Sequence, residues 1–218
     1  MKLTVPNSGQ FISFEGSEGA GKTTQIALLQ DWLKAKKLKV ITLREPGATK
    51  LGEAVRNLLK HDPAGEGMCP ESELLLFCAS RAQLVREVIQ PALASGTWVI
   101  ADRFHDSTTV YQGYARGLPL KLVETINDFA LSSTIPDLTL YLDLDTQTSL
   151  ARAQQRTGPK DRMEQEPSEF FSKVRQGYLN LFKEQGNRFR MIQAVGSKQE
   201  IFNLILKEIK SAFPDIRY

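Results

Sequence analysis

The chain has 218 residues, of which 41% are hydrophobic and 24% are charged, a composition typical of one globular domain. A formal net charge of +3 without a dense basic cluster does not indicate a nucleic-acid-binding protein. The first residues form no apolar leader, and no later run approaches the ~18 apolar residues of a membrane span. We therefore expect a single domain over 1–218, soluble and cytoplasmic, that binds neither nucleic acid nor a membrane.

Short β-like runs alternate with longer helical patterns along the whole chain, which predicts an α/β fold with a parallel sheet. The predicted strands are 10–15, 39–44, 97–102, 138–144 and 188–194. The predicted helices are 23–37, 50–61, 71–94, 105–116, 119–132, 146–156, 167–185 and 197–212. Pro91 lies inside the third of these helices, so we expect an end or a kink just before it.

The first predicted strand leads into a phosphate-binding pattern, G-x-x-x-x-G-K-[ST]. Its residues are Gly16, Ser17, Glu18, Gly19, Ala20, Gly21, Lys22 and Thr23. The apolar strand before the loop and the amphipathic helix after it supply the context that the motif requires. Backbone N–H groups and the helix N-terminus would hold phosphate, Lys22 would reach the β- and γ-phosphates, and Thr23 would bind Mg²⁺. The pattern therefore predicts binding of a nucleoside triphosphate.

Two charged residues end the third predicted strand. Asp102 takes the usual position of a carboxylate that holds Mg²⁺ through water, although a helix-capping acid would fit the same place. Arg103 beside it suits a second ligand that carries phosphate. Glu18, by contrast, puts a negative charge inside a loop that binds anions, and this acid needs an explanation.

Two predicted helix faces carry groups suited to a nucleobase. Phe77 and Arg81 lie four residues apart, so that an aromatic ring and a guanidinium share one face. Thr108, Tyr111 and Gln112 follow the spacing i, i+3 and i+4, with hydroxyl and amide groups that match a base edge. Taken alone, the first pair is better explained by a core phenylalanine beside a surface arginine. Two such faces next to one phosphate site favour a nucleotide acceptor.

At this point the sequence resembles the bacterial-type thymidylate kinases (dTMP kinases), which are P-loop nucleoside monophosphate kinases. The matching segments are FISFEGSEGAGKTTQ, LREPGAT, LLLFCASRAQ, ADRFHDSTTVYQG, PDLTLYLDLD and DRMEQE. The resemblance implies a three-layer P-loop NTPase fold in which helices flank a five-stranded parallel sheet. It also implies a homodimer that transfers the γ-phosphoryl group of ATP to dTMP with Mg²⁺.

The resemblance assigns roles around the thymine base. It implies that Phe77 stacks on the ring and that Arg81 donates to O4. Thr108 and Gln112 match the positions at which members of the family read the N3 edge.

Other positions match the sugar and phosphate contacts of the family. Arg103 would bind the dTMP phosphate, and Tyr111 would pack where a 2′-hydroxyl would otherwise lie. Glu15 would contact the sugar or the metal region. Arg44 and Pro46 would line the acceptor pocket, and a recess for the thymine methyl group would be worth only ~1–3 kcal/mol in selectivity.

The polar segment 154–167 is interpreted as a lid over the site, with a solvated charged loop as the alternative. Bacterial-type members lack a basic residue in the phosphate loop and supply arginines from the lid, so Glu18 would hold a lid arginine over ATP. Arg156 and Arg162 are the candidates for stabilising the transition state. The sequence RTGPKDR is one residue longer than the usual R-G-x-L-D-R, which leaves the choice between these two arginines open.

Two other functions remain possible from the residues alone. A deoxynucleoside kinase would use a similar fold, but it needs a carboxylate base for a neutral hydroxyl, whereas Arg103 suits an acceptor that already carries phosphate. A nucleotide-dependent switch protein would hydrolyse ATP slowly and act through a partner. The two cysteines, Cys69 and Cys78, lack metal-ligand or CxxC spacing and are expected to be reduced thiols.

Overall fold

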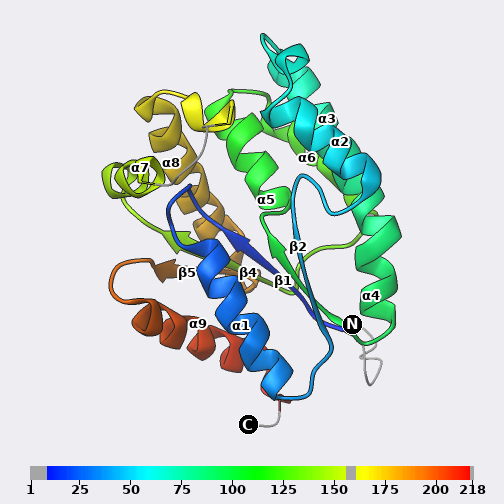
Figure 1. Cartoon of the computed structure of the whole chain (residues 1–218), viewed down its shortest axis with the longest axis vertical. Helices are drawn as coiled ribbons and strands as arrows, with labels where there is room; N and C mark the ends of the chain where they lie inside the picture. Colours follow the sequence, from blue (N-terminus) through cyan, green and yellow to red (C-terminus); the bar gives the residue numbers. More distant parts are fainter. Residues whose placement is uncertain (1–8, 156–160, 217–218) are drawn as a thin grey trace.

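A computed structural model describes residues 9–155 and 161–216. Five parallel strands form one sheet in the order β2-β3-β1-β4-β5 (Figure 1). The strands are β1 (Phe11–Glu15), β2 (Val40–Arg44), β3 (Trp98–Asp102), β4 (Leu138–Asp143) and β5 (Phe189–Gln193). Each strand begins and ends within one residue of its predicted run, so the predicted five-stranded α/β fold is confirmed.

Alternate side chains of β1 enter two different cores, as expected for a sheet covered on both faces. Ile12 packs in a core that includes residues of α1 (Lys22–Ala35) and α9 (Lys198–Ala212). Phe11 packs on the opposite face, against residues of α3 (Pro70–Leu84) and the turn that follows it. Helices therefore lie on both sides of the sheet, which gives the three-layer arrangement seen in Figure 1.

The other helices also lie close to their predicted positions. They are α2 (Lys50–Lys60), α4 (Gln90–Ala94), α5 (His105–Thr108), α6 (Leu120–Leu131), α7 (Thr146–Gln154) and α8 (Ser168–Glu184). Short 3₁₀ turns occur at η1 (Pro63–Gly65), η4 (Met163–Gln165) and η5 (Gly186–Arg188).

Two predicted helices contain π-helical turns. The helix predicted over 71–94 continues past Pro91 through η2 (Val85–Ile89), where the N–H of Gln90 donates to the carbonyl of Val85, five residues earlier. The interruption expected at the proline is therefore a wider turn just before it, and not an end of the helix. In the helix predicted over 105–116, the turn η3 (Thr109–Ala115) is π-helical and carries Tyr111 and Gln112. Such turns occur frequently at functional sites.

The described part of the predicted lid packs against α2. Asp161 caps the turn η4 by accepting from the N–H groups of Met163 and Glu164 at 2.9 and 3.0 Å. Asp161 also forms an ion pair with Lys60 at 2.6 Å. Residues 156–160, which include Arg156, lie outside the described residues. Within the part of the chain that is described, no helix is long and apolar enough to cross a membrane.

Candidate functional site

The phosphate loop joins the end of β1 to the start of α1, and its shape depends on close approach to neighbouring elements. A Cβ atom at Gly16, whose φ is 137°, would lie 2.6 Å from the carbonyl oxygen of Leu142. A Cβ atom at Gly19, whose φ is 78°, would lie 2.6 Å from the carbonyl oxygen of Ser149. Both positions therefore require glycine for two reasons, the left-handed backbone and the lack of space.

Lys22 folds back over this loop. Its ammonium group donates to the carbonyl oxygens of Gly16 and Ser17, each at 3.0 Å. Burial, together with the positive charge of Arg103, lowers the pKa of Lys22 to about 8, although three neighbouring carboxylates oppose this shift. The side chain thus lies where phosphate oxygens would replace its carbonyl partners.

The two predicted metal ligands lie side by side. The hydroxyl of Thr23 donates to the carboxylate of Asp102 at 3.2 Å, because β1 and β3 are neighbouring strands that end at the same edge of the sheet. Hydroxyl and carboxylate oxygens suit Mg²⁺, which takes few protein ligands and completes its coordination with phosphate and water. The residues therefore fit Mg²⁺ bound together with a nucleotide.

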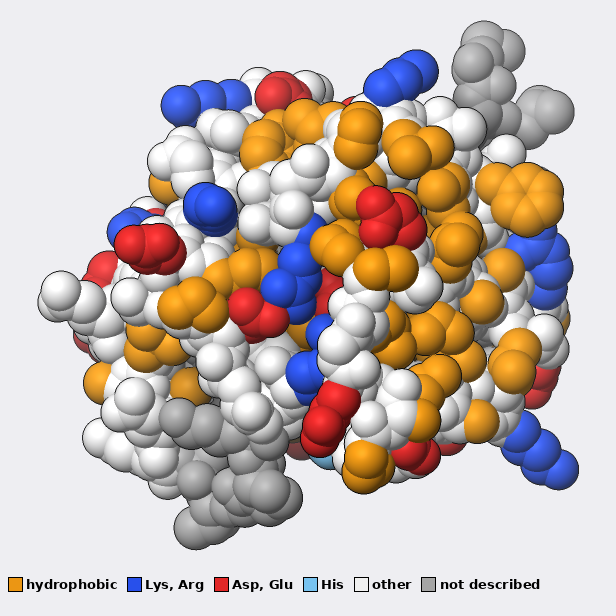
Figure 2. Space-filling model, turned by 90° about the horizontal axis from the view of Figure 1, so that it is seen from above, with side chains coloured by type: hydrophobic (Ala, Val, Ile, Leu, Met, Phe, Trp, Pro, Cys, Tyr) orange, Lys and Arg blue, Asp and Glu red, His pale blue; other side chains and the backbone are white. Residues whose placement is uncertain are grey.

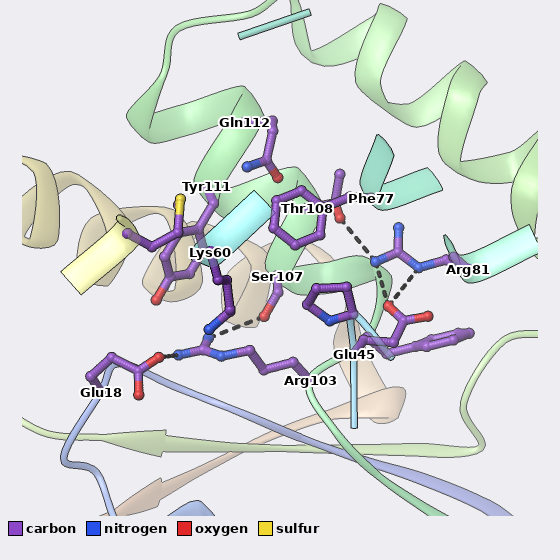
Figure 3. Close-up of a pocket in the computed structure, with 13 residues that line it drawn as sticks. Glu18, Glu45, Lys60, Phe77, Arg81, Arg103, Ser107, Thr108, Tyr111 and Gln112 are labelled. Atoms are coloured by element: carbon purple, nitrogen blue, oxygen red, sulfur yellow. Dashed lines mark hydrogen bonds and ion pairs between the residues drawn. The ribbon is translucent and has the colours of Figure 1, made fainter. Parts of the chain in front are cut away.

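Two cavities adjoin at this edge. The larger extends over the phosphate loop and is lined by Thr23, Arg44, Arg56, Asp102 and Arg152, among others. The smaller is shown in Figure 3. It is lined by seven of the predicted acceptor residues, namely Pro46, Phe77, Arg81, Arg103, Thr108, Tyr111 and Gln112. The structure thus brings together residues from three distant segments of the sequence.

Arg44 was expected to line the acceptor pocket. In the structure it lines the larger cavity instead, and it pairs with Glu53.

An ion pair lies where the two cavities meet. Glu18 and Arg103 line both cavities, and their side chains approach to 2.6 Å (Figure 3). Burial by itself would raise the pKa of Glu18, but the charges of Arg103, Lys22 and Lys60 hold it far below its ordinary value. Arg103 has a left-handed backbone with φ of 71°, a conformation that is costly for an arginine and that occurs at functional sites. Glu18 is therefore an ionised partner that orients Arg103 between the two cavities.

Glu15 is not where the sequence placed it. It was expected to contact the sugar or the metal region, but it is fully buried and is not among the described residues that line either cavity. It accepts hydrogen bonds from the N–H of Phe104 at 2.8 Å, the hydroxyl of Ser107 at 2.6 Å and the hydroxyl of Tyr178 at 3.1 Å. Ser107 and Tyr178 in turn accept from Arg103, each at 3.3 Å. Glu15 thus supports the residues that hold Arg103.

Arg81, which was expected to donate to thymine O4, lines the smaller cavity and is held by acceptors of the protein. Its guanidinium is 1% exposed and donates twice to Glu45, at 2.9 and 2.5 Å. It also donates to Thr108 at 2.9 Å, to Asn127 at 2.7 Å and more weakly to Cys78 at 3.9 Å. All five N–H donors of an arginine are thereby engaged within the protein. In this structure Arg81 holds Thr108 in place at the wall of the smaller cavity.

Arg162, a candidate for the catalytic lid arginine, points towards the acceptor side. Its guanidinium donates to the carboxylate of Glu73 and to the carbonyl of Leu59. With these contacts, Arg162 is not among the described residues that line either cavity. Arg152 is the arginine of the lid region that lines the larger cavity in the described part of the chain.

Several residues of the site were not identified from the sequence. Glu45, Lys60 and Ser107 line the smaller cavity. Glu45 could have been identified from its place next to Arg44 in the REPG turn. Lys60 could not, because it lies at the end of an amphipathic helix, where a lysine is common. Tyr178 reaches Arg103 from α8, and no spacing rule connects residues so far apart.

Comparison with known proteins agrees with this geometry. A model of the thymidylate kinase family matches residues 14–205. The chain belongs to the thymidylate kinase family. This membership confirms the predicted family and the predicted enzyme class, a kinase that phosphorylates dTMP.

Individual members of the thymidylate kinase family match nearly the whole chain. The thymidylate kinase of Kosmotoga olearia is 44% identical over 198 residues, which cover 91% of this chain and 94% of that protein. The thymidylate kinase of Syntrophus aciditrophicus is 46% identical over 205 residues, covering 91% and 93%. The crystal structure of thymidylate kinase from Ehrlichia chaffeensis superposes with a TM-score of 0.74 at 33% identity, covering 93% of this chain and 99% of that one.

The environment of Glu15 predicts how stability depends on pH. Burial, and then the charge of Asp106, raises the pKa of Glu15 from 4.5 to about 8. Between these two pKa values the folded state keeps a proton that the unfolded chain releases. Glu15 therefore makes the free energy of unfolding fall as pH rises from 4.5 to about 8. Glu15→Gln should flatten this fall, measured by urea unfolding between pH 5 and about 8. Glu71→Gln, at an exposed position of α3, is the matched control and should keep the parent slope; an unchanged slope in Glu15→Gln would contradict the assignment.

Proposed function

We propose that this protein transfers the γ-phosphoryl group of ATP to dTMP in the presence of Mg²⁺, and that it acts in the cytoplasm. The observation that carries this proposal is the Glu18–Arg103 ion pair, whose residues line both the cavity over the phosphate loop and the cavity that contains the side chains predicted to bind a base. The donor phosphates would occupy the loop, and Arg103 would hold the phosphate of dTMP. Family membership supports dTMP as the acceptor, and the loop supports a nucleoside triphosphate as the donor.

The protein's contribution to this reaction is positioning and charge. The phosphate of dTMP is already a nucleophile at neutral pH, so no general base is required. Lys22 would exchange its carbonyl partners for phosphate oxygens, and Arg103 would orient the acceptor phosphate in line. Mg²⁺, held by Thr23 and Asp102, would neutralise charge on the donor phosphates.

The remaining acceptor residues would select the nucleoside. Phe77 would stack on the base, and Tyr111 would pack against the deoxyribose. The Arg103 guanidinium lies 5.1 Å from the centre of the Tyr111 ring, and both side chains line the smaller cavity. Pro46, at the wall of the same cavity, would border the thymine methyl group.

An acceptor panel tests this function. Purified protein, ATP and Mg²⁺ are incubated with dTMP, dUMP, dCMP, dAMP, dGMP or thymidine, and ADP and the phosphorylated product are followed together. We expect rapid conversion of dTMP, slower conversion of dUMP and no reaction with thymidine. Conversion of thymidine would instead indicate a deoxynucleoside kinase, and ADP release that is independent of any acceptor would indicate a switch protein.

We also propose that an arginine from the lid region stabilises the transferring phosphoryl group. The candidates remain Arg156 and Arg162, and Arg152 joins them because it lines the cavity over the loop. For Arg162 to act, its contacts with Glu73 and Leu59 must be exchanged for contacts with phosphate.

Replacing each of these three arginines by glutamine separates them. Loss of the catalytic arginine should lower kcat by ~10³ or more with little change in ATP affinity, because the interaction exists only in the transition state. Turnover is measured at saturating ATP and dTMP, and ATP affinity by equilibrium binding. The lid assignment fails if all three variants retain kcat within a few-fold of the parent.

A homodimer is a further proposal, supported by exposed apolar side chains on α3 and α6. Leu75 is 56% exposed, Leu122 is 47% exposed and Phe129 is 82% exposed. Hydrophobic side chains gather over part of the face in Figure 2, and exposed apolar groups of this kind mark protein–protein contacts. The two helices pack against each other through a small buried core that contains Leu74 and Val123.

The Phe129→Glu variant tests this interface. The parent should have twice the chain mass of 24.4 kDa by light scattering, and the variant should have the mass of one chain, because a buried, unpaired carboxylate opposes association. Phe182→Glu, at a 37% exposed position on α8, is the control and should remain dimeric. A parent that scatters as a single chain would exclude the homodimer.

A further inference from the structure

We propose that Glu73 is a positioning residue that sets the hydrogen-bond polarity of the base pocket, through the amide of Gln112. The pocket then accepts a pyrimidine with an N–H at N3 and a carbonyl at position 4, and it disfavours cytosine. This inference rests on the proposed function, because it assumes that the base in this pocket belongs to a deoxynucleotide acceptor.

The orientation of the Gln112 amide follows from its partner. Its nitrogen donates to Glu73 Oε1 at 2.8 Å. An ionised carboxylate can only accept hydrogen bonds, so the NH₂ group must face it. The amide oxygen is thereby directed to the other side, towards Phe77 in Figure 3. The cavity therefore presents a hydrogen-bond acceptor at this position.

Two arginines keep Glu73 in its acceptor-only form. The carboxylate is 1% exposed, and it accepts from Arg116 at 3.1 and 3.2 Å and from Arg162. Burial would raise the pKa of Glu73, but the hydrogen bonds and charges of these partners lower it below the ordinary value. Arg116 also pairs with Glu166 at 2.6 Å. The carboxylate is thus charged and held from several sides, so the amide of Gln112 has one favourable orientation.

A second buried carboxylate sets the opposite polarity at the adjacent position. Glu45 holds Arg81, and Arg81 donates to the hydroxyl oxygen of Thr108 at 2.9 Å. Because the Thr108 oxygen accepts this bond, its own hydrogen can donate into the cavity. The pocket therefore offers a donor from Thr108 and an acceptor from Gln112.

This pair of groups complements one class of pyrimidine. Thymine and uracil carry a carbonyl oxygen at position 4 and an N–H at N3, whereas cytosine carries an amino group and a bare ring nitrogen at these positions. Cytosine would place donor against donor and acceptor against acceptor. Such a mismatch leaves buried polar groups unpaired, which is the strongest means of discrimination that a binding pocket has. If Glu73 is neutralised, the Gln112 amide can rotate and accommodate either pattern.

The test compares selectivity in three variants. Glu73→Gln removes the charge and offers Gln112 both a donor and an acceptor. Glu73→Asp keeps the charge for the arginines but withdraws the carboxylate by one methylene, so it tests the same contact in a protein that retains its ion pairs. Arg162→Met removes the lid contact, whereas the two hydrogen bonds from Arg116 still keep Glu73 charged and the Glu73–Gln112 bond stays in place. The readouts are the ratio of kcat/KM for dTMP over dCMP and the ratio of their equilibrium dissociation constants without ATP.

We expect both Glu73 variants to reduce these ratios by about tenfold or more, and Arg162→Met to keep the parent ratio whatever its turnover. Ratios within twofold of the parent in a folded Glu73 variant would overturn the inference. An equal loss in Arg162→Met would also overturn it, because the effect would then come from lid docking. The binding ratio separates this inference from the proposed function. If the parent protein binds dTMP more tightly than dCMP but does not phosphorylate dTMP, the proposed reaction is refuted and the inference about Glu73 is not.

Discussion

The ion pair between Glu18 and Arg103 is the interaction on which the arrangement of the site depends. Glu18 lies in the loop after β1 and Arg103 directly follows β3, so the pairing of these neighbouring strands brings the two residues together. An acid within a phosphate loop is unfavourable for anion binding by itself. Here its charge is balanced by Arg103, Lys22 and Lys60. The acid therefore orients a cation between the donor and acceptor cavities, which is where a phosphoryl group must be transferred.

Three further buried glutamates hold neighbouring side chains in place behind the cavity walls. Glu15 supports Ser107 and Tyr178, Glu45 holds Arg81, and Glu73 holds Gln112. Each lies at most 5% exposed, so removal of a partner would leave an uncompensated buried group at a cost of several kcal/mol. This arrangement fixes the side chains that face the ligands before any ligand binds, which reduces the entropy lost on binding.

The sequence predicted most of the fold because its strands are short apolar runs with polar boundaries. It also predicted the convergence of Phe77, Thr108 and Gln112, since helical spacing places such residues on shared faces. It failed for Glu15, because the partner Tyr178 is 163 residues away and no local pattern links them. It left the choice between Arg156 and Arg162 open, and it could not show that Arg162 contacts the distant buried carboxylate of Glu73. The π-helical turn before Pro91 was expected only as an end or a kink, because a missing N–H does not by itself specify how the helix accommodates the proline.

The most direct test of the central claim is a double-mutant cycle on Glu18 and Arg103. The variants Glu18→Gln, Arg103→Gln and the double variant are compared by kcat/KM for dTMP at saturating ATP. If the pair acts as one unit, the loss in the double variant should be smaller than the sum of the single losses, with a coupling free energy of at least ~1 kcal/mol. Losses that add to within ~0.3 kcal/mol would contradict the account, because Glu18 would then act independently of Arg103.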